Sequence, residues 1–519
     1  MDAIIHPPGS LPASYRAAAT LGLAAALAAA SLAAVGDQGL SGSGLALLGT
    51  GVLVVAVFSA LLWVRPLAVL ILALVFTTSP IPLALSLPQS ALVSAFLLAA
   101  AFVGFAMRTP GRSIVPDPIL LPVGVFAAYG IASAIYGYWA GNELSSVAGD
   151  CFQLIEFAAV YFLAGQLLKT GGAIRMLLVW VLGSMLLTIV VELMLSILGS
   201  DAGGLLPSWE ASSQGESLVR TIDIDATILF TVLINLYPLL RSPKHRLLIW
   251  LALIPTVANI ALSLARGLWL CTLVAMVVSL LLQSRKARAR LLKAAAYLAV
   301  SITLLAAAWK VGSGADASLM DVFEERIFHG VDQVEEGFAG TESLATRRFL
   351  EMVIVGPQVL ARPWFGYGLG ATYIIGGFAV LDAGTEGLID HHFIHNLYLG
   401  TTFRMGLAGL GLLFWVLFAY FRKILKAYRR MPSELDRTEP NQTGVNQARV
   451  NQARVNQALL NRGLIAGVVA SLVGQLFLSV TQPTVVDHPT CILIAGAMAL
   501  SFRLAPSGDS ARIGAEHGI

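Results

Sequence analysis

Apolar residues occupy most of the chain in long stretches, and short polar or proline-containing segments separate one stretch from the next. A helix that crosses a membrane needs about 20 mainly apolar residues. Stretches of this kind, some of them slightly short, are found at residues 17–35, 44–64, 66–80, 90–107, 118–139, 151–168, 174–198, 224–240, 246–264, 267–283, 291–309, 396–421, 463–481 and 489–503. The pattern therefore predicts an all-α bundle of about fourteen transmembrane helices.

Composition agrees with a polytopic membrane protein. Hydrophobic residues make up 57% of the chain and charged residues 12%, and the mean hydropathy is +0.78. These values lie far outside the range of soluble proteins. The three cysteines, Cys151, Cys271 and Cys491, lie within or beside apolar stretches at no metal-like spacing, which favours packing roles over a disulfide framework.

Lysine and arginine residues collect in alternate breaks between the predicted helices. Because such residues stay mainly on the cytoplasmic side of a membrane, the bias places the N-terminus inside the cell. Residues 1–309 then hold membrane helices one to eleven, and residues 310–394 form a large periplasmic loop. Residues 395–504 hold three further helices and a cytoplasmic loop at residues 422–462, and a cytoplasmic tail follows at residues 505–519.

The two long polar segments differ in pattern. The outer loop has the amphipathic spacing of helices at residues 318–334 and 346–361. The motif RPWFGYGLG at residues 362–370 follows, and its proline and glycines predict a turn rather than a phosphate-binding loop, because no strand precedes it. In the inner loop, the VNQAR repeat at residues 445–459 has a period of five that spreads the valines around a helix. We interpret it as a tolerated repeat in a solvated loop.

Polar residues also stand at the edges of the apolar stretches. The segment DHHFIHNLYLG, residues 390–400, places three histidines directly before a long apolar run. Their i, i+1 and i+4 spacing directs adjacent side chains apart, which argues against a metal site. Arg266 lies in a short hairpin between two apolar stretches, where a charge is unfavourable unless it is paired or solvated in a cavity. Arg404 lies deeper, and we expect a structural pairing with Glu192 or Glu156.

Two of these segments carry motifs of a known family. His395-Asn396, nine further residues, Gly406, two residues and Gly409 resemble the pattern of the bacterial O-antigen ligases, and RGLWL from Arg266 to Leu270 resembles their second pattern, Arg, three residues, Leu. PWFGYGLG is also similar to a stretch in the outer loop of that superfamily, and Arg220 lies where such proteins have an arginine before a helix. The resemblance covers residues 215–421. It implies a membrane glycosyltransferase scaffold of the C type, although about twelve helices are usual for the ligases.

The resemblance also implies a reaction. Such proteins transfer a glycan from undecaprenyl diphosphate to an acceptor hydroxyl, either on another glycan or on the lipid A-core, at the outer face of the bacterial inner membrane. Arginines can neutralise a diphosphate leaving group without a metal, and a histidine suits general-base work. We therefore expect catalytic roles for His395, Arg266 and Arg220.

Further substrate-binding residues are expected around these three, and they are Asn396, Arg347, Arg348, His392, Gly366 and Gly368. We expect no metal ion, no cofactor and no nucleic-acid partner, and the membrane lipids are the surroundings of the site. The same motifs serve polymerases and ligases, and the large outer loop and the additional helices slightly favour a polymerase.

A transporter is the competing class. Buried Glu156, Glu192 and Arg404 could line a substrate path between helices. However, no inverted repeat is visible in the sequence, and the polar residues gather at the outer edge of the predicted bundle.

Overall fold

The computed structural model describes residues 66–79, 87–108, 117–198, 224–240, 242–263, 266–297, 344–375, 389–391, 394–431, 445–480 and 490–505. Its helices are α3 (Pro66–Thr77), α4 (Leu87–Arg108), α5 (Leu120–Trp139), α6 (Leu144–Leu167), α7 (Gly171–Leu198), α8 (Ile224–Leu236), the 3-10 helix η3 (Tyr237–Leu239), α9 (Pro243–Leu262), α10 (Arg266–Leu282), α13 (Leu344–Ala361), α14 (Leu397–Arg430), α15 (Val445–Leu478) and α16 (Thr490–Leu504). Two short strands, β1 (Tyr373–Ile375) and β2 (Ile389–His391), form an antiparallel ribbon.

The helical class predicted from the apolar pattern is confirmed for the described residues. Five of their helices are long and apolar enough to cross a membrane, namely Leu120–Trp139, Leu144–Leu167, Gly171–Met194, Leu397–Arg430 and Val455–Leu478. Shorter apolar helices accompany them. The chain is therefore built as a multi-pass membrane protein. The first two predicted spans, residues 17–35 and 44–64, lie outside the described residues, so the total of about fourteen stays a prediction.

Several boundaries differ from those expected. Helix α14 continues to Arg430 and α15 begins at Val445, so the VNQAR repeat forms the first turns of a helix instead of part of a loop. Residues 285–297 are helical, although the first of them were expected to connect two spans. Alanine, arginine, lysine and glutamine, which are frequent in these segments, have good helix propensity, and a helix can continue beyond its apolar part. The ribbon β1–β2 was also not expected.

Helix α15 packs against α8 and α10, which both run antiparallel to it. Gly467 lies against Val232 of α8, and Gly474 lies against Cys271 of α10, which lets the backbones approach closely. Further along α15, the buried side chains of Leu268 and Leu478 pack in one cluster. Helices α8 and α10 therefore both begin where α15 ends.

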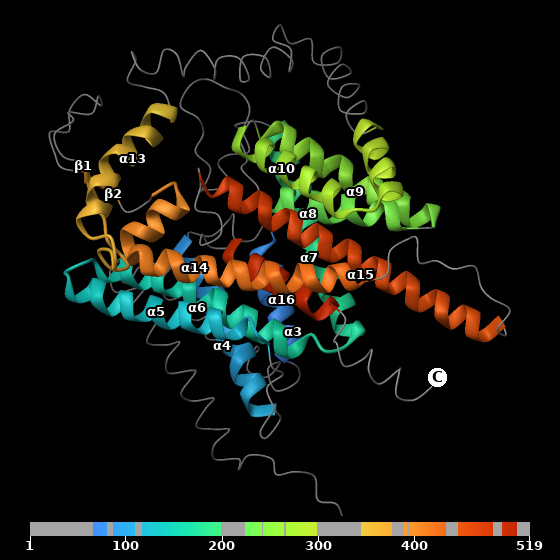
Figure 1. Cartoon of the computed structure of the whole chain (residues 1–519), viewed down its shortest axis with the longest axis horizontal. Coiled ribbons are helices and arrows are strands. Elements are labelled where there is room, and N and C mark those ends of the chain that lie inside the picture. Colours follow the sequence, from blue (N-terminus) through green and yellow to red (C-terminus); the bar gives the residue numbers. More distant parts are fainter. Residues whose placement is uncertain are drawn as a thin grey trace, which may run out of the picture.

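Helix α14 begins at the same place. The Leu397 amide donates to the Ser479 carbonyl over 2.9 Å, and the Tyr398 hydroxyl donates to the Leu476 carbonyl over 2.8 Å. Figure 1 shows α14 and α15 side by side through the middle of the molecule. We call this end of the bundle, defined by the starts of α8, α10 and α14 and the end of α15, the converging end.

The helix directions agree with the alternation expected from the charge pattern. In that scheme α8, α10 and α14 all enter the membrane from the outer side, and α15 leaves on the outer side. At the opposite end, the guanidinium of Arg503 in α16 donates to the Gly165 carbonyl near the end of α6. The side of the membrane that each end faces stays a prediction.

Cysteine labelling tests this orientation. Ser145 is exposed near the start of α6 at the converging end, and Lys286 is exposed in the basic segment after α10. We expect a membrane-impermeant maleimide to label Ser145→Cys and not Lys286→Cys in intact cells, because lysine-rich and arginine-rich segments stay inside. Permeabilised cells, in which both positions should react, provide the control. Labelling of Lys286→Cys alone in intact cells would reverse the orientation.

Candidate functional site

The RGLWL motif forms the tight hairpin expected from the sequence. Helix α9 ends at Leu262 and α10 begins at Arg266. The indole nitrogen of Trp269 donates to the Ile260 carbonyl over 2.8 Å and so ties α10 to α9. Arg266 is the first residue of α10, and its side chain lies outside the described part of the structure. The hairpin thus fixes the backbone position of Arg266 at the converging end.

The second motif, His395-Asn396, starts α14. The Asn396 side chain caps the helix by accepting a hydrogen bond from the Leu399 amide over 3.0 Å. A cap needs a short side chain with an acceptor oxygen, so this position has a structural reason for its residue type as well as the predicted role in substrate binding. His395 precedes the cap, and its side chain is 46% exposed.

A buried carboxylate holds His395 in place. Glu351 of α13 is 6% exposed, and its Oε2 lies 3.1 Å from Nδ1 of His395. Its other oxygen, Oε1, accepts a hydrogen bond from the His395 amide over 2.8 Å. One carboxylate therefore fixes both the main chain and the ring of the histidine, and Nε2 is the nitrogen on the far side of the ring from it.

A small separate core supports this pair. Val355 of α13, Tyr373 of β1, Ile394 and Phe403 of α14 are buried together in it. Burial raises the pKa of the Tyr373 phenol to about 12, and the negative charge of Glu351 adds to the increase. Tyr373 therefore stays protonated at neutral pH and cannot serve as a base.

Helix α14 is broken at Gly406. The backbone angles of Gly406 are φ 67° and ψ −175°, which no helical residue adopts. Its Cα faces the main chain of Trp364, so that an added Cβ would collide with the Trp364 carbonyl. The strip of small residues expected to run from His395 through Gly406 to Gly409 on one helix face is therefore interrupted, because the helix changes course between them.

The turn at residues 362–370 supplies the hydrogen bonds that the break removes. After the break, the amides of Leu407 and Ala408 donate to the carbonyls of Pro363 and Trp364 over 2.7 and 3.2 Å. Before the break, the carbonyls of Phe403 and Arg404 accept from two amides of the turn, those of Tyr367 and Gly368, each over 2.9 Å.

The three glycines of this turn have positive φ and pack against helix backbones. Gly366 lies against Arg404 of α14, Gly368 against Gly137 of α5, and Gly370 against Val147 of α6. Their amides donate to Arg362, Arg404 and Asp150 respectively, and these internal bonds fit the turn expected from the sequence better than a phosphate-binding loop. Substrate binding by Gly366 and Gly368 stays a prediction.

Arg404 has a different partner from those expected. Its guanidinium lies 3.2 Å from Oδ1 of Asp150 in α6, and the other oxygen of Asp150 accepts from the Gly370 amide over 2.8 Å. Glu192 instead accepts from the Asn259 side chain over 2.9 Å. The expectation that Arg404 pairs with Glu192 or Glu156 was therefore wrong about the partner and right about a structural pairing.

Other predicted site residues are described only in part. Arg347 and Arg348 lie in α13, one helical turn before Glu351, and their side chains are outside the described residues. His391 pairs through its backbone with Tyr373 in the ribbon. His392 and Arg220 both lie outside the described residues. Among the residues that are described, no group of three His, Cys, Asp or Glu side chains is placed to hold a metal ion.

Sequence reasoning missed Glu351 and Asp150. Glu351 lies within the amphipathic helix predicted at residues 346–361, four residues before Val355 and thus on the same face. An acidic residue on the apolar face of an amphipathic helix could have indicated that Glu351 is buried in the protein. Its partner was not readable, because His395 is 44 residues away in the chain.

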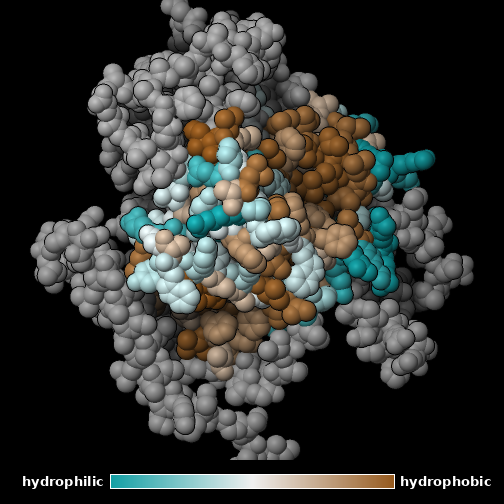
Figure 2. All heavy atoms as spheres, turned by 60° about the vertical axis from the view of Figure 1, so that its left-hand side comes forward, coloured by the Kyte–Doolittle hydropathy of each residue, from teal (hydrophilic) through white to brown (hydrophobic). Residues whose placement is uncertain are grey.

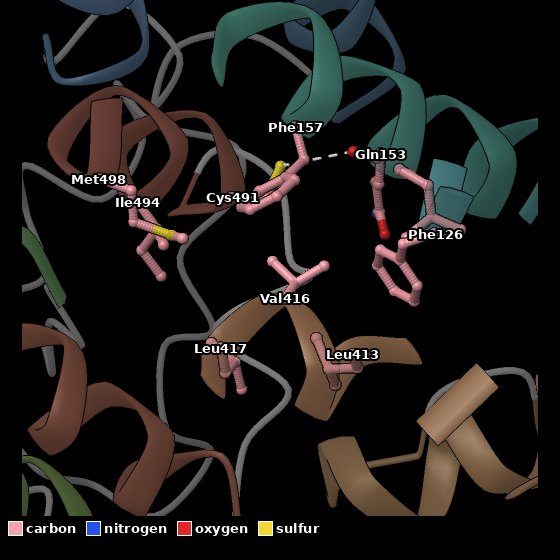
Figure 3. Close-up of a pocket in the computed structure, with 10 residues that line it drawn as sticks. Phe126, Gln153, Phe157, Leu413, Val416, Leu417, Cys491, Ile494 and Met498 are labelled. Atoms are coloured by element: carbon pink, nitrogen blue, oxygen red, sulfur yellow. Dashed lines mark hydrogen bonds between the residues drawn. The ribbon is translucent and has the colours of Figure 1, made fainter. Parts of the chain in front are cut away.

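An apolar cavity lies deeper in the bundle, away from these residues. Figure 3 shows Phe126 of α5, Phe157 of α6, and Val416 of α14 pointing into it, with Cys491 and Met498 of α16 at its side. No charged residue lines it. The cavity therefore offers no chemistry of its own, and the candidate site is the converging end.

A multi-pass membrane protein with an arginine hairpin and a carboxylate-held histidine at one end is the class that the fold and site define. Residues 250–414 match the family model described as O-antigen ligase. No curated protein sequence gives a significant match. The family match confirms the resemblance drawn from the motifs, because the RGLWL motif and the motif that begins at His395 both lie within the matched residues.

The break in α14 provides a stability test. Gly406→Ala should destabilise the protein by about 1–3 kcal/mol or more, because alanine disfavours positive φ and its Cβ would meet the Trp364 backbone. Gly411→Ala is the matched control in the same helix, since Gly411 has open space around it and alanine favours a helix. Thermal unfolding of the purified protein in detergent measures both. Equal melting temperatures for the two variants would contradict the assigned role of Gly406.

Proposed function

We propose that this protein transfers a glycan from undecaprenyl diphosphate to an acceptor hydroxyl, with His395 as the general base. The observation that carries the proposal is the pairing of His395 with buried Glu351 at the converging end, where α10 also begins with Arg266. The predicted topology makes this the periplasmic face of the inner membrane.

The contact with Glu351 suits His395 to remove a proton. A carboxylate at Nδ1 keeps the proton on that nitrogen, so Nε2 accepts the proton of the acceptor hydroxyl. The same carboxylate stabilises the imidazolium that forms. The half-exposed ring allows an acceptor to approach, while Glu351 itself stays buried.

Arginines and helix ends favour a diphosphate beside the histidine. Helices α8, α10 and α14 all present their N-terminal, electropositive ends at the converging end. Arg266 begins α10, Arg220 precedes α8 by four residues, and Arg347 and Arg348 lie one turn from Glu351. Guanidinium groups bind phosphate oxygens in a forked manner, so they can neutralise the leaving group without a metal ion.

The reaction then balances without a cofactor. The acceptor oxygen forms a bond to the anomeric carbon of the donor as the bond from that carbon to the diphosphate oxygen breaks. The hydroxyl proton moves to Nε2 of His395, and undecaprenyl diphosphate leaves with its charge neutralised by the arginines. The acceptor is a growing glycan in a polymerase and the lipid A-core in a ligase, and both use the same chemistry.

Substitutions separate the base from the donor site. His395→Ala should lower transfer about 10²–10⁴-fold while donor binding persists, because the base acts on the acceptor. Arg266→Ala and Arg220→Ala should weaken donor binding as well as turnover, and Arg266→Lys should recover only part of both because an ammonium group lacks the fork. The measurement is glycan transfer from purified undecaprenyl diphosphate donor by each reconstituted variant, together with donor affinity.

His391→Ala is the matched control, since His391 lies in the ribbon and should retain nearly full transfer. Transfer should also persist in EDTA. Near-normal activity of His395→Ala would remove His395 as the base, and strong inhibition by EDTA would restore a metal site as the working hypothesis.

Glu351 should act as a positioning residue through His395. Glu351→Gln keeps the size of the side chain but loses its charge, so turnover should fall with little change in donor affinity. The rising limb of the pH profile of turnover should also move to lower pH, because the protonated imidazole loses the carboxylate that stabilises it. Glu351→Asp should restore part of the activity. An unchanged pH profile for a folded Glu351→Gln variant would leave Glu351 with a packing role only.

A further inference from the structure

Helix α13 carries its polar and apolar residues in an inverted arrangement. Glu351 and Val355 lie on the face that packs against α14, and Glu351 is buried. The opposite face is exposed and apolar, with Met352, Val353 and Leu360 exposed by 42%, 48% and 77%. A helix of a soluble domain shows the reverse pattern. The exposed face of α13 is therefore suited to an apolar environment outside the protein.

The turn after α13 extends this exposed apolar surface. Trp364 and Phe365 are each 67% exposed, although the main chain of the same turn is tightly bonded to α14. Arg362 lies beside them and is also exposed. Trp and Phe side chains next to a basic residue are typical of segments that lie in the headgroup region of a membrane.

The surface is continuous with the end of a predicted membrane span. The guanidinium of Arg362 donates to the hydroxyl of Tyr136 in α5 over 3.3 Å. The last residues of α5, Tyr138 and Trp139, are exposed by 55% and 80%. Helix α5 is long and apolar enough to cross a membrane, so its exposed aromatic end marks a membrane–water interface.

The space-filling view shows polar and apolar surface next to each other on this part of the molecule (Figure 2). With the part of the molecule that carries α13 and the turn brought forward, Figure 2 shows pale and teal residues between two brown areas. Apolar surface therefore continues on both sides of a mixed zone.

We propose that the surface formed by Met352, Val353, Leu360, Trp364 and Phe365 rests in the lipid bilayer, at the boundary between headgroups and acyl chains. Helix α13 then lies on the membrane as an interfacial helix, with Glu351 and His395 on its protein-facing side. Arg362 adds a positive charge suited to anionic phospholipid headgroups. This inference rests on exposure and continuity, and it holds whatever reaction the protein performs.

A glycan-binding platform is the other class of partner that exposed aromatic residues could serve. The aliphatic residues on the same face favour lipid, because a sugar stacks on flat rings and gains little from Val353 or Leu360. The face also points away from Glu351, on the opposite side of α13. A lipid-seated α13 would hold His395 at the depth where the phosphate groups of a lipid are found.

Depth-dependent quenching tests the proposal in the full-length protein. A bimane label on Val353→Cys, Leu360→Cys or Trp364→Cys, in a background with Cys151→Ala, is measured in vesicles of phosphatidylethanolamine and phosphatidylglycerol. Cys271 and Cys491 are buried and should not react. We expect strong quenching by lipids with a doxyl group at carbon 5, weaker quenching at carbon 12, and little quenching by aqueous iodide.

Ser145→Cys is the matched control, because Ser145 is exposed and its hydroxyl donates to the carboxylate of Glu143. Aqueous iodide should therefore quench a label at this position. Hydroxyl-radical footprinting of the unlabelled protein gives an independent readout, in which Trp364 and Phe365 should be protected in vesicles. Quenching of the three labels by iodide and not by doxyl lipid would overturn the proposal. Protection from iodide that appears only on addition of a soluble glycan would replace it with the glycan platform.

Discussion

The main-chain hydrogen bonds at the break of α14 are the constraint on which the site depends. A helix in a membrane cannot leave amides and carbonyls unsatisfied, because the hydrocarbon offers them no partner. At Gly406 the turn of residues 362–370 provides these partners on both sides of the break. This requirement joins α13 and the turn to α14, and it thereby brings Glu351 to His395. A functional contact between two distant segments follows from the need to complete a broken helix.

Two buried acidic residues of the described bundle are bonded to polar groups of neighbouring segments. Asp150 is bonded to Arg404 and to the Gly370 amide, and Glu192 is bonded to Asn259. Burying a charge without such partners would be strongly unfavourable. Glu192 and Arg404, two of the three residues that by sequence alone could line a transport path, thus have structural partners. The side chain of His395, by contrast, is 46% exposed.

The convergence of helix ends also suits the proposed reaction. Helices α8, α10 and α14 begin together where α15 ends, so their electropositive ends act on the same region. An interfacial α13 would place that region at the level of lipid phosphates. A diphosphate carried by a polyprenyl chain could then reach the arginines without leaving the membrane, while a hydrophilic acceptor approaches from the water.

The sequence by itself determined the class of protein, the positions of most apolar helices among the described residues, and the motif residues, because hydrophobic length, charge bias and short motifs are local properties. It also indicated α13, the glycine turn and the Arg266 hairpin, since amphipathic spacing, proline and glycine act over a few residues. The tertiary structure decided the partners: Glu351 for His395, Asp150 for Arg404, and the turn for the break at Gly406. These contacts join residues 36 to 254 positions apart, and those at Gly406 also depend on a backbone change at one glycine. Such contacts arise only when packing brings helices together, and no periodicity along the chain records them.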